Sequence, residues 1–176
     1  MSRIPLVNLD QQPESIRQWA ASRGNLNVFR LLANAPRMFG GWTEMVDELF
    51  ASPTFDARMR ELIILRVAHL QASPYELGQH VPLARSAGLT DQQIDAIMGA
   101  GDLDKAGFGR ADRVALDVVA ELCTTHHLSD ECFAAAHAIF GDDPFTELLM
   151  ITSCYYGLAL VLNAADLDVD VAGEPA

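Results

Sequence analysis

The fold is decided by residues 57–71, which read ARMRELIILRVAHLQ. Asp56 precedes this stretch at the place where a helix N-cap belongs, and apolar side chains then fill most positions of 62–68. A helix with so little polar surface belongs deep in a core. No strand-like alternation of apolar and polar residues persists in the chain, whereas helical spacing recurs through most of it. We therefore predict an all-α fold.

Further helices are expected on both sides of this central stretch. The preceding residues predict helices over 12–23 and 28–50, the second broken near Pro36 or Gly40-Gly41. Capping-box patterns open two more helices, at Ser73-Pro74-Tyr75-Glu76 and at Thr90-Asp91-Gln92-Gln93, and Gly88 ends the first of them. The remaining helices are expected over 111–125, over 129–140 and from Asp143-Pro144 onward.

Composition limits the classes of function. The chain has 176 residues, of which 50% are hydrophobic, and 12 Lys and Arg against 24 Asp and Glu give a formal net charge of −12. A chain of this length buries enough surface to need no disulfide or structural metal, and its apolar content excludes intrinsic disorder. The acid excess repels nucleic acid and anionic membrane surfaces, so neither is an expected partner.

The expected organisation is an N-terminal helical extension over 1–55 packed on a helical core over 56–165, followed by an acidic tail over 166–176. Residues 148–165 carry no charge, which approaches the length of a membrane span. Polar residues interrupt this run, and it is flanked by Glu147 and Asp166 with no adjacent Lys or Arg. We predict a core or interface helix here instead of a membrane helix.

The cysteines favour a cytoplasmic protein without a metal or other cofactor. Cys123, Cys132 and Cys154 are odd in number, lie at no metal-ligand spacing and form no Cys-x-x-Cys pair. The N-terminus reaches Asp10 before an apolar run develops, so no secretory signal is expected.

The residues that could carry chemistry gather around the helix that begins at Pro74. Glu76 and His80 are four residues apart, so they share one face and the carboxylate can hold the imidazole in one tautomer for acid–base work. Glu61 lies in the apolar central helix, where a carboxylate needs a partner or a proton. Tyr75 adds a hydroxyl beside the helix start, where backbone N–H groups favour a bound anion.

Each of these residues also has a structural interpretation. Ser73 and Glu76 are explained as the two members of a capping box without any catalysis. His80 is equally explained as a hydrogen-bonded helix histidine, and Glu61 as an ion-pair partner of Arg58 or Arg85. The sequence alone leaves both interpretations open.

Two quoted runs carry a family resemblance: Arg60-Glu61-Leu62-Ile63-Ile64-Leu65-Arg66-Val67-Ala68, and then Tyr75-Glu76-Leu77-Gly78-Gln79-His80-Val81-Pro82-Leu83-Ala84-Arg85-Ser86-Ala87-Gly88-Leu89. Together they resemble the core of the carboxymuconolactone decarboxylase family, which includes the AhpD-like proteins. The resemblance is densest from Arg58 to Met98 and continues more loosely to Asn163, with Tyr155-Tyr156 in what resembles the last helix of the family.

The resemblance implies an AhpD-like helical bundle and assigns residues to roles. AhpD-like peroxidases use a Glu, a Cys-x-x-Cys pair and a His, which fall on Glu61, on Ser73 and Glu76, and on His80. Because neither Ser nor Glu forms a thiolate, that thiol chemistry is excluded at this site. The acid–base half remains and resembles the decarboxylase branch, which acts on a carboxylated lactone from aromatic catabolism.

On this basis we expect a cofactor-independent lyase or decarboxylase for a small carboxylated or lactone substrate. His80, Glu76 and Glu61 are the expected catalytic residues, and the expected substrate-binding residues are Tyr75, Ser73, Arg85 and Tyr155. The resemblance also implies a homo-oligomer, as a dimer, trimer or hexamer. A catalytically silent oligomeric binding protein of the same fold is the alternative, and an atypical peroxidase is a third.

Overall fold

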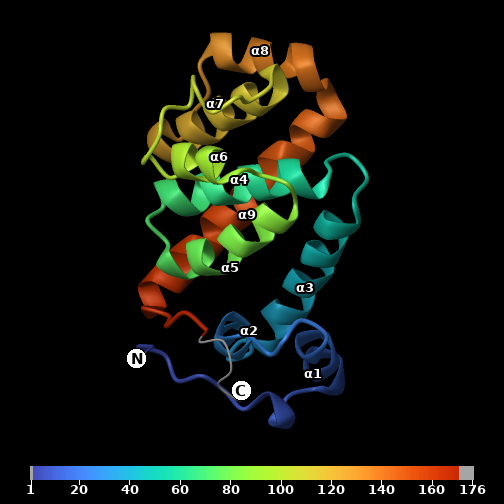
Figure 1. Cartoon of the computed structure of the whole chain (residues 1–176). Helices are drawn as coiled ribbons and strands as arrows, with labels where there is room; N and C mark the ends of the chain where they lie inside the picture. The colour runs from blue at the N-terminus through green and yellow to red at the C-terminus, as the bar shows by residue number, and fades with distance from the viewer. Residues whose placement is uncertain (1, 171–176) are drawn as a thin grey trace. The chain divides into compact units, whose positions relative to one another are not determined.

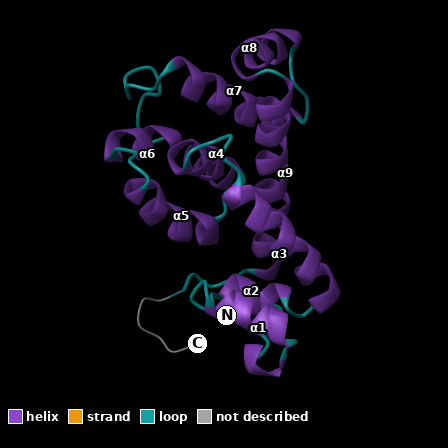
Figure 2. Cartoon of the chain, turned by 90° about the vertical axis from the view of Figure 1, so that its right-hand side faces the viewer, coloured by secondary structure: helices purple, strands orange, loops and turns teal. Residues whose placement is uncertain are grey.

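The computed structural model describes residues 2–170. These residues form helices and loops and contain no strand, which confirms the all-α prediction (Figure 1, Figure 2). The tail predicted over 166–176 falls largely outside the described residues. The chain divides into two compact units, one comprising Met1–Ser52 with Val161–Ala176 and the other Pro53–Leu160.

The first unit is built around aromatic side chains. It contains a 3-10 helix, η1 (Leu9–Gln11), and the helices α1 (Glu14–Ala21), α2 (Asn27–Leu32) and α3 (Pro36–Ala51). The ring of Trp19 packs edge-on against Phe29, Phe39 and Trp42. The predicted break is found at Pro36, which begins α3, whereas Gly40-Gly41 lie inside α3 and do not interrupt it.

The second unit is organised around α4 (Ala57–Leu70). Asp56 caps this helix by accepting a hydrogen bond from the backbone N–H of Met59 at 2.8 Å, as its position predicts. The side chains of Leu62, Ile63, Ile64, Leu65, Val67 and Ala68 are fully buried. Helices α5 (Pro74–Ser86), α6 (Asp91–Ile97) and α7 (Arg110–Thr125) all contact α4, which is therefore the centre of this unit (Figure 2).

The two predicted capping boxes differ. Thr90 accepts from the backbone N–H of Gln93 at 3.2 Å, and the Gln93 side chain accepts from the backbone N–H of Thr90 at 3.1 Å. That box is complete and opens α6. At the start of α5, Ser73 occupies the N-cap position but its hydroxyl makes no capping hydrogen bond. The capping-box interpretation of Ser73 and Glu76 is therefore wrong.

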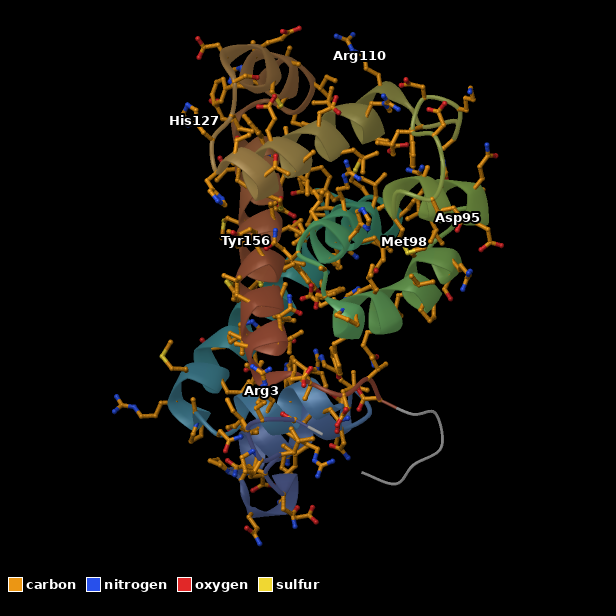
Figure 3. All side chains as sticks on the ribbon, turned by 90° about the vertical axis from the view of Figure 1, so that its left-hand side faces the viewer. Arg3, Asp95, Met98, Arg110, His127 and Tyr156 are labelled. Carbon is orange, nitrogen blue, oxygen red and sulfur yellow. The ribbon has the colours of Figure 1, made fainter. Side chains whose placement is uncertain are left out.

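A bidentate ion pair joins α4 to α7. The Arg58 guanidinium donates to both carboxylate oxygens of Asp112 at 2.9 Å, and Asp112 also accepts from the backbone N–H of Gly109. Figure 3 shows α7 with Arg110 at its first residue and His127 just beyond its end. The same carboxylate thus caps α7 and ties it to the central helix.

The last two helices are α8 (Asp130–Phe140) and α9 (Asp142–Ala165). Ser129 caps α8 by accepting from the backbone N–H of Cys132. Helix α9 is long and apolar enough to cross a membrane by length and composition, but core helices of soluble proteins pass the same test. Its buried side chains include Leu148, Ile151, Tyr155 and Ala159, as expected of a core helix.

Candidate acid–base site

The site begins with an ion pair between two helices of the second unit. Glu61, on α4, is 4% exposed, and its Oε2 lies 2.9 Å from Nδ1 of His80 on α5. Glu61 is one of very few polar positions in the buried stretch of α4, and the adjoining helix supplies its partner. An imidazole that donates Nδ1–H to a carboxylate keeps Nε2 for proton exchange.

This pair corrects two sequence-based expectations. Glu61 does not pair with Arg58 or Arg85, because Arg58 bonds to Asp112 and Arg85 bonds to Asp91 at 2.7 Å. The carboxylate that holds His80 is also Glu61, whose partner lies 19 residues away, and no hydrogen bond joins His80 to Glu76.

Glu76 is the chemically unusual member of the cluster. Its side chain is 2% exposed, and neither carboxyl oxygen has a hydrogen-bond partner. Burial raises the pKa of Glu76 from 4.5 to about 8, because the charged form loses its hydration and gains no compensating contact. The group is therefore a neutral carboxylic acid at neutral pH, and it can donate a proton.

Ser73, one turn before Glu76, is also a buried polar residue without a hydrogen-bond partner. It is fully buried, and its hydroxyl oxygen has no hydrogen-bond partner. Ser73 and Glu76 are three residues apart at the first turn of α5, so they lie on neighbouring positions of one helix face. Buried polar groups in native proteins nearly always have a hydrogen-bond partner. Two buried polar side chains without one on the same helical turn therefore need an explanation.

Tyr155 brings α9 into the cluster. Its ring lies edge-on to the imidazole of His80, with ring centroids 5.2 Å apart at an interplanar angle of 88°. Burial raises the pKa of Tyr155 well above its ordinary value, and the charges of Glu61 and Glu76 raise it further. Both carboxyls therefore lie near this phenol, which stays a neutral hydroxyl.

The other two predicted binding residues have different locations. Tyr75 is 3% exposed at the start of α5, adjacent in sequence to Glu76. Arg85 lies in the last turn of the same helix, about 14 Å along the axis from Glu76, and its exposed side chain pairs with Asp91. The structure thus does not bring Arg85 to the cluster, and the prediction that it binds substrate there loses its geometric basis.

Sequence reasoning did not single out Arg60, which the structure adds to the surroundings of Tyr155. Its positive charge favours the ionised phenol and so lowers the pKa of Tyr155, against the effect of burial and of the carboxylates. Arg60 also donates to the backbone carbonyl of Phe55. Its position directly before Glu61 is the one signal that could have indicated this role.

Metal and thiol chemistry find little support at this cluster. Within residues 2–170, no group of three or more His, Cys, Asp and Glu side chains is arranged to hold a metal ion. Cys123, Cys132 and Cys154 form no disulfide with one another. Burial raises the pKa of Cys123, and it raises that of Cys132 to about 11, so both stay protonated and unreactive at neutral pH.

The fold of the described residues is that of the AhpD-like proteins. It superimposes on an uncharacterized peroxidase-related protein from Ralstonia eutropha JMP134 with an AhpD core, at a TM-score of 0.83 and 21% identity over 96% of this chain and 92% of that one. A peroxidase-related protein from Silicibacter sp. TM1040 gives a TM-score of 0.79 at 16% identity, over 96% and 92% of the two chains. A protein of unknown function from Agrobacterium tumefaciens gives 0.70 at 18% identity, over 80% and 95%. At these identities the likeness establishes the fold alone.

Residues 36–121 match the model of the carboxymuconolactone decarboxylase family. These residues are therefore similar to the carboxymuconolactone decarboxylase family and the fold is AhpD-like, which confirms the resemblance predicted from the sequence. A comparison with curated protein sequences gives no match. Among the described residues, α9 is the one helix long and apolar enough to cross a membrane, and a single such helix is weak evidence for a membrane span.

Proposed function

We propose that the Glu61–His80–Glu76 cluster performs cofactor-independent acid–base chemistry on a small molecule. The observation that carries this proposal is the unpartnered carboxyl of Glu76, which is 2% exposed and has a pKa raised to about 8. A neutral carboxylic acid beside a carboxylate–imidazole pair provides a proton donor and a proton acceptor at the same pH.

The reaction class that fits is decarboxylation or proton transfer next to the carbonyl of a carboxylated or plain lactone. In a decarboxylation the bond to the carboxylate breaks, carbon dioxide leaves, and the electron pair moves into the unsaturated lactone. His80 first takes up a proton from solvent at Nε2 and then delivers it to carbon, returning to the neutral imidazole, while Glu61 holds the ring through Nδ1. The Glu76 carboxyl donates to the oxygen on which negative charge develops.

A carboxyl-lyase of aromatic catabolism is the finer assignment that the family resemblance supports. The peroxidase-related names of the structural neighbours are equally compatible with the fold. In this chain a peroxidase would need another chemistry, because Ser73 and Glu76 stand where the AhpD-like proteins that the sequence resembles carry their thiols.

We also propose a cytoplasmic homo-oligomer. The three cysteines form no disulfide with one another, which suits a reducing compartment. Met150 and Leu160 are 56% and 52% exposed on α9, and the exposed residues between them, Ser153 and Gly157, continue the same helix face. A second copy would cover this face. Replacing Met150 and Leu160 together by Glu is expected to convert the oligomer to monomer in light scattering coupled to size exclusion.

A catalytically silent binding protein of the same fold is the competing function. It would use the cluster only to bind a ligand, with no proton transferred.

The test is turnover of a panel of lactones, with and without a carboxylate, by the wild type and by His80→Asn. The variant is expected to lose about 10²- to 10⁴-fold in kcat. His137→Asn is the matched control, because this exposed histidine on α8 also pairs with a carboxylate, that of Asp142. Turnover that is equal in wild type and His80→Asn refutes the acid–base role of His80, whereas binding of a lactone without any turnover by the wild type supports the silent binding protein.

A further inference from the structure

The first turn of α5 holds two buried polar side chains that nothing in the protein satisfies. The hydroxyl of Ser73 is fully buried, and the carboxyl of Glu76 is 2% exposed. Leaving such a group without a partner costs about 1–3 kcal/mol. The cap that would normally satisfy both groups does not form, although the sequence pattern for it is present and the same pattern forms a complete cap at Thr90.

Both groups can act as hydrogen-bond donors at the same turn of α5. A serine hydroxyl always carries a donor proton, and a carboxyl that is neutral at neutral pH carries one as well. Because the two residues are three apart on one turn, their side chains are neighbours on the helix surface. One acceptor atom placed against this turn would satisfy both.

The surrounding charges favour an uncharged acceptor. Glu61 and Glu76 both lie near Tyr155. The arginines of α4 and α5 all bond to acceptors of the protein itself: Arg58 to Asp112, Arg60 to the Phe55 carbonyl, Arg66 to the Ile97 carbonyl and Arg85 to Asp91. A carboxylate placed against Ser73 and Glu76 would meet other carboxyls, and each guanidinium of these two helices already donates to an acceptor elsewhere in the protein.

We propose that Ser73 and Glu76 form a hydrogen-bond-donating subsite for the uncharged carbonyl oxygen of a small ketone, ester or lactone. The proposal rests on the acid–base function above and deepens it by naming the substrate group that faces α5. If the substrate also carries a carboxylate, that group points away from this turn. As charge develops on the carbonyl oxygen, both bonds strengthen, which is how such donors lower a barrier.

The experiment measures binding and needs no turnover. Butenolide, an unsaturated five-membered lactone labelled with ¹³C at its carbonyl, is titrated with the full chain and observed by NMR. Cyclopentanone serves as a second neutral probe and cyclopentanecarboxylate as the charged one. In the wild type we expect both neutral probes to bind, the butenolide carbonyl carbon to shift as in strong hydrogen bonds, and the carboxylate to bind more weakly.

The variants separate the two donors. Ser73→Ala removes one hydroxyl and should weaken butenolide binding about 5- to 10-fold, the value of one hydrogen bond. Ser86→Ala is the matched control, because this serine is exposed in the last turn of the same helix, and its affinity should equal that of the wild type. Glu76→Gln keeps a neutral donor and should retain binding, whereas Glu76→Met should lose it.

The proposal is overturned if Ser73→Ala binds butenolide as tightly as Ser86→Ala, if Glu76→Met binds as tightly as Glu76→Gln, or if the wild type prefers the carboxylate or binds neither neutral probe. Failure of the acid–base function gives a different result. In that case turnover survives in His80→Asn, while the relative butenolide affinities of the Ser73 and Glu76 variants stay as predicted. Folding of each variant is checked by circular dichroism, and Ser73→Ala removes an unsatisfied group, so it should fold at least as well as the wild type.

Discussion

The neutral carboxyl of Glu76 makes a quantitative prediction about folding stability and pH. Its pKa is raised from 4.5 to about 8 in the folded chain, so in this window the folded state holds a proton that the unfolded state has released. Stability therefore falls as pH rises, by about 1.4 kcal/mol per pH unit while only the unfolded state is ionised. Across the whole window the loss amounts to about 5 kcal/mol.

Glu76→Gln removes this titration while keeping the shape of the side chain. Urea unfolding of wild type and variant at several values from about pH 5 to about pH 8 gives the difference in the free energy of unfolding at each pH. We expect Gln to become progressively favoured as pH rises, with a slope close to the value above. Below the ordinary pKa of Glu the difference should become constant, since the carboxyl is then protonated in both states.

The matched control is Glu131→Gln, which changes an exposed carboxylate on α8 to an amide. The stability difference between that variant and the wild type should stay nearly level over the same pH range, because an exposed side chain has almost the same surroundings folded and unfolded. If Glu76→Gln and Glu131→Gln give parallel profiles, the Glu76 carboxyl is ionised in the folded protein, and its role as a neutral donor is refuted.

Three further predictions concern other contacts within the second unit, including one in the candidate site. Asp112→Ala leaves the half-buried guanidinium of Arg58 unpaired and should lower the free energy of unfolding by about 3 kcal/mol in urea; a loss below the error of the measurement would show that the pair is solvated. Gly99→Ala should cost about 1–2 kcal/mol, because φ is +78° and the new Cβ would lie 3.2 Å from Nε2 of His69; an unchanged melting temperature would contradict the strain. Tyr155→Phe keeps the ring beside the imidazole whereas Tyr155→Leu does not, so kcat should fall further in the Leu variant, and equal kcat values would show that the ring does not position the imidazole.

The fold was predictable because the apolar residues of its central helix are nearly continuous in the sequence. The run from Leu62 to Ala68 leaves almost no polar surface, so burial on all sides is its only stable arrangement, and the structure buries it fully. Helix starts at Asp56 and Thr90 were also predictable, because a cap depends on residues within one turn.

Most members of the candidate site were predictable from the sequence, although Arg85 lies away from it and Arg60 was not predicted, and the contacts between the members were not predictable. The pairing of His80 with Glu61 joins two helices across 19 residues, and spacing rules describe neighbours within one helix only. Glu76 and Gln93 occupy the same place in the same local pattern, yet Gln93 completes a cap and Glu76 does not. That difference follows from the tertiary structure, since Ser73 is fully buried while Thr90 is exposed.

The unsatisfied pair at Ser73 and Glu76 has a consequence for any large-scale mutagenesis of this chain. A screen that scores only soluble expression or heat resistance should enrich Ala at 73 and apolar residues such as Met at 76, because each removes an unpaired buried group. A screen that scores ligand-dependent growth should deplete the same variants. At these two positions the same substitutions should raise the abundance score and lower the functional score. Engineering for stability alone would therefore remove the ligand-binding groups.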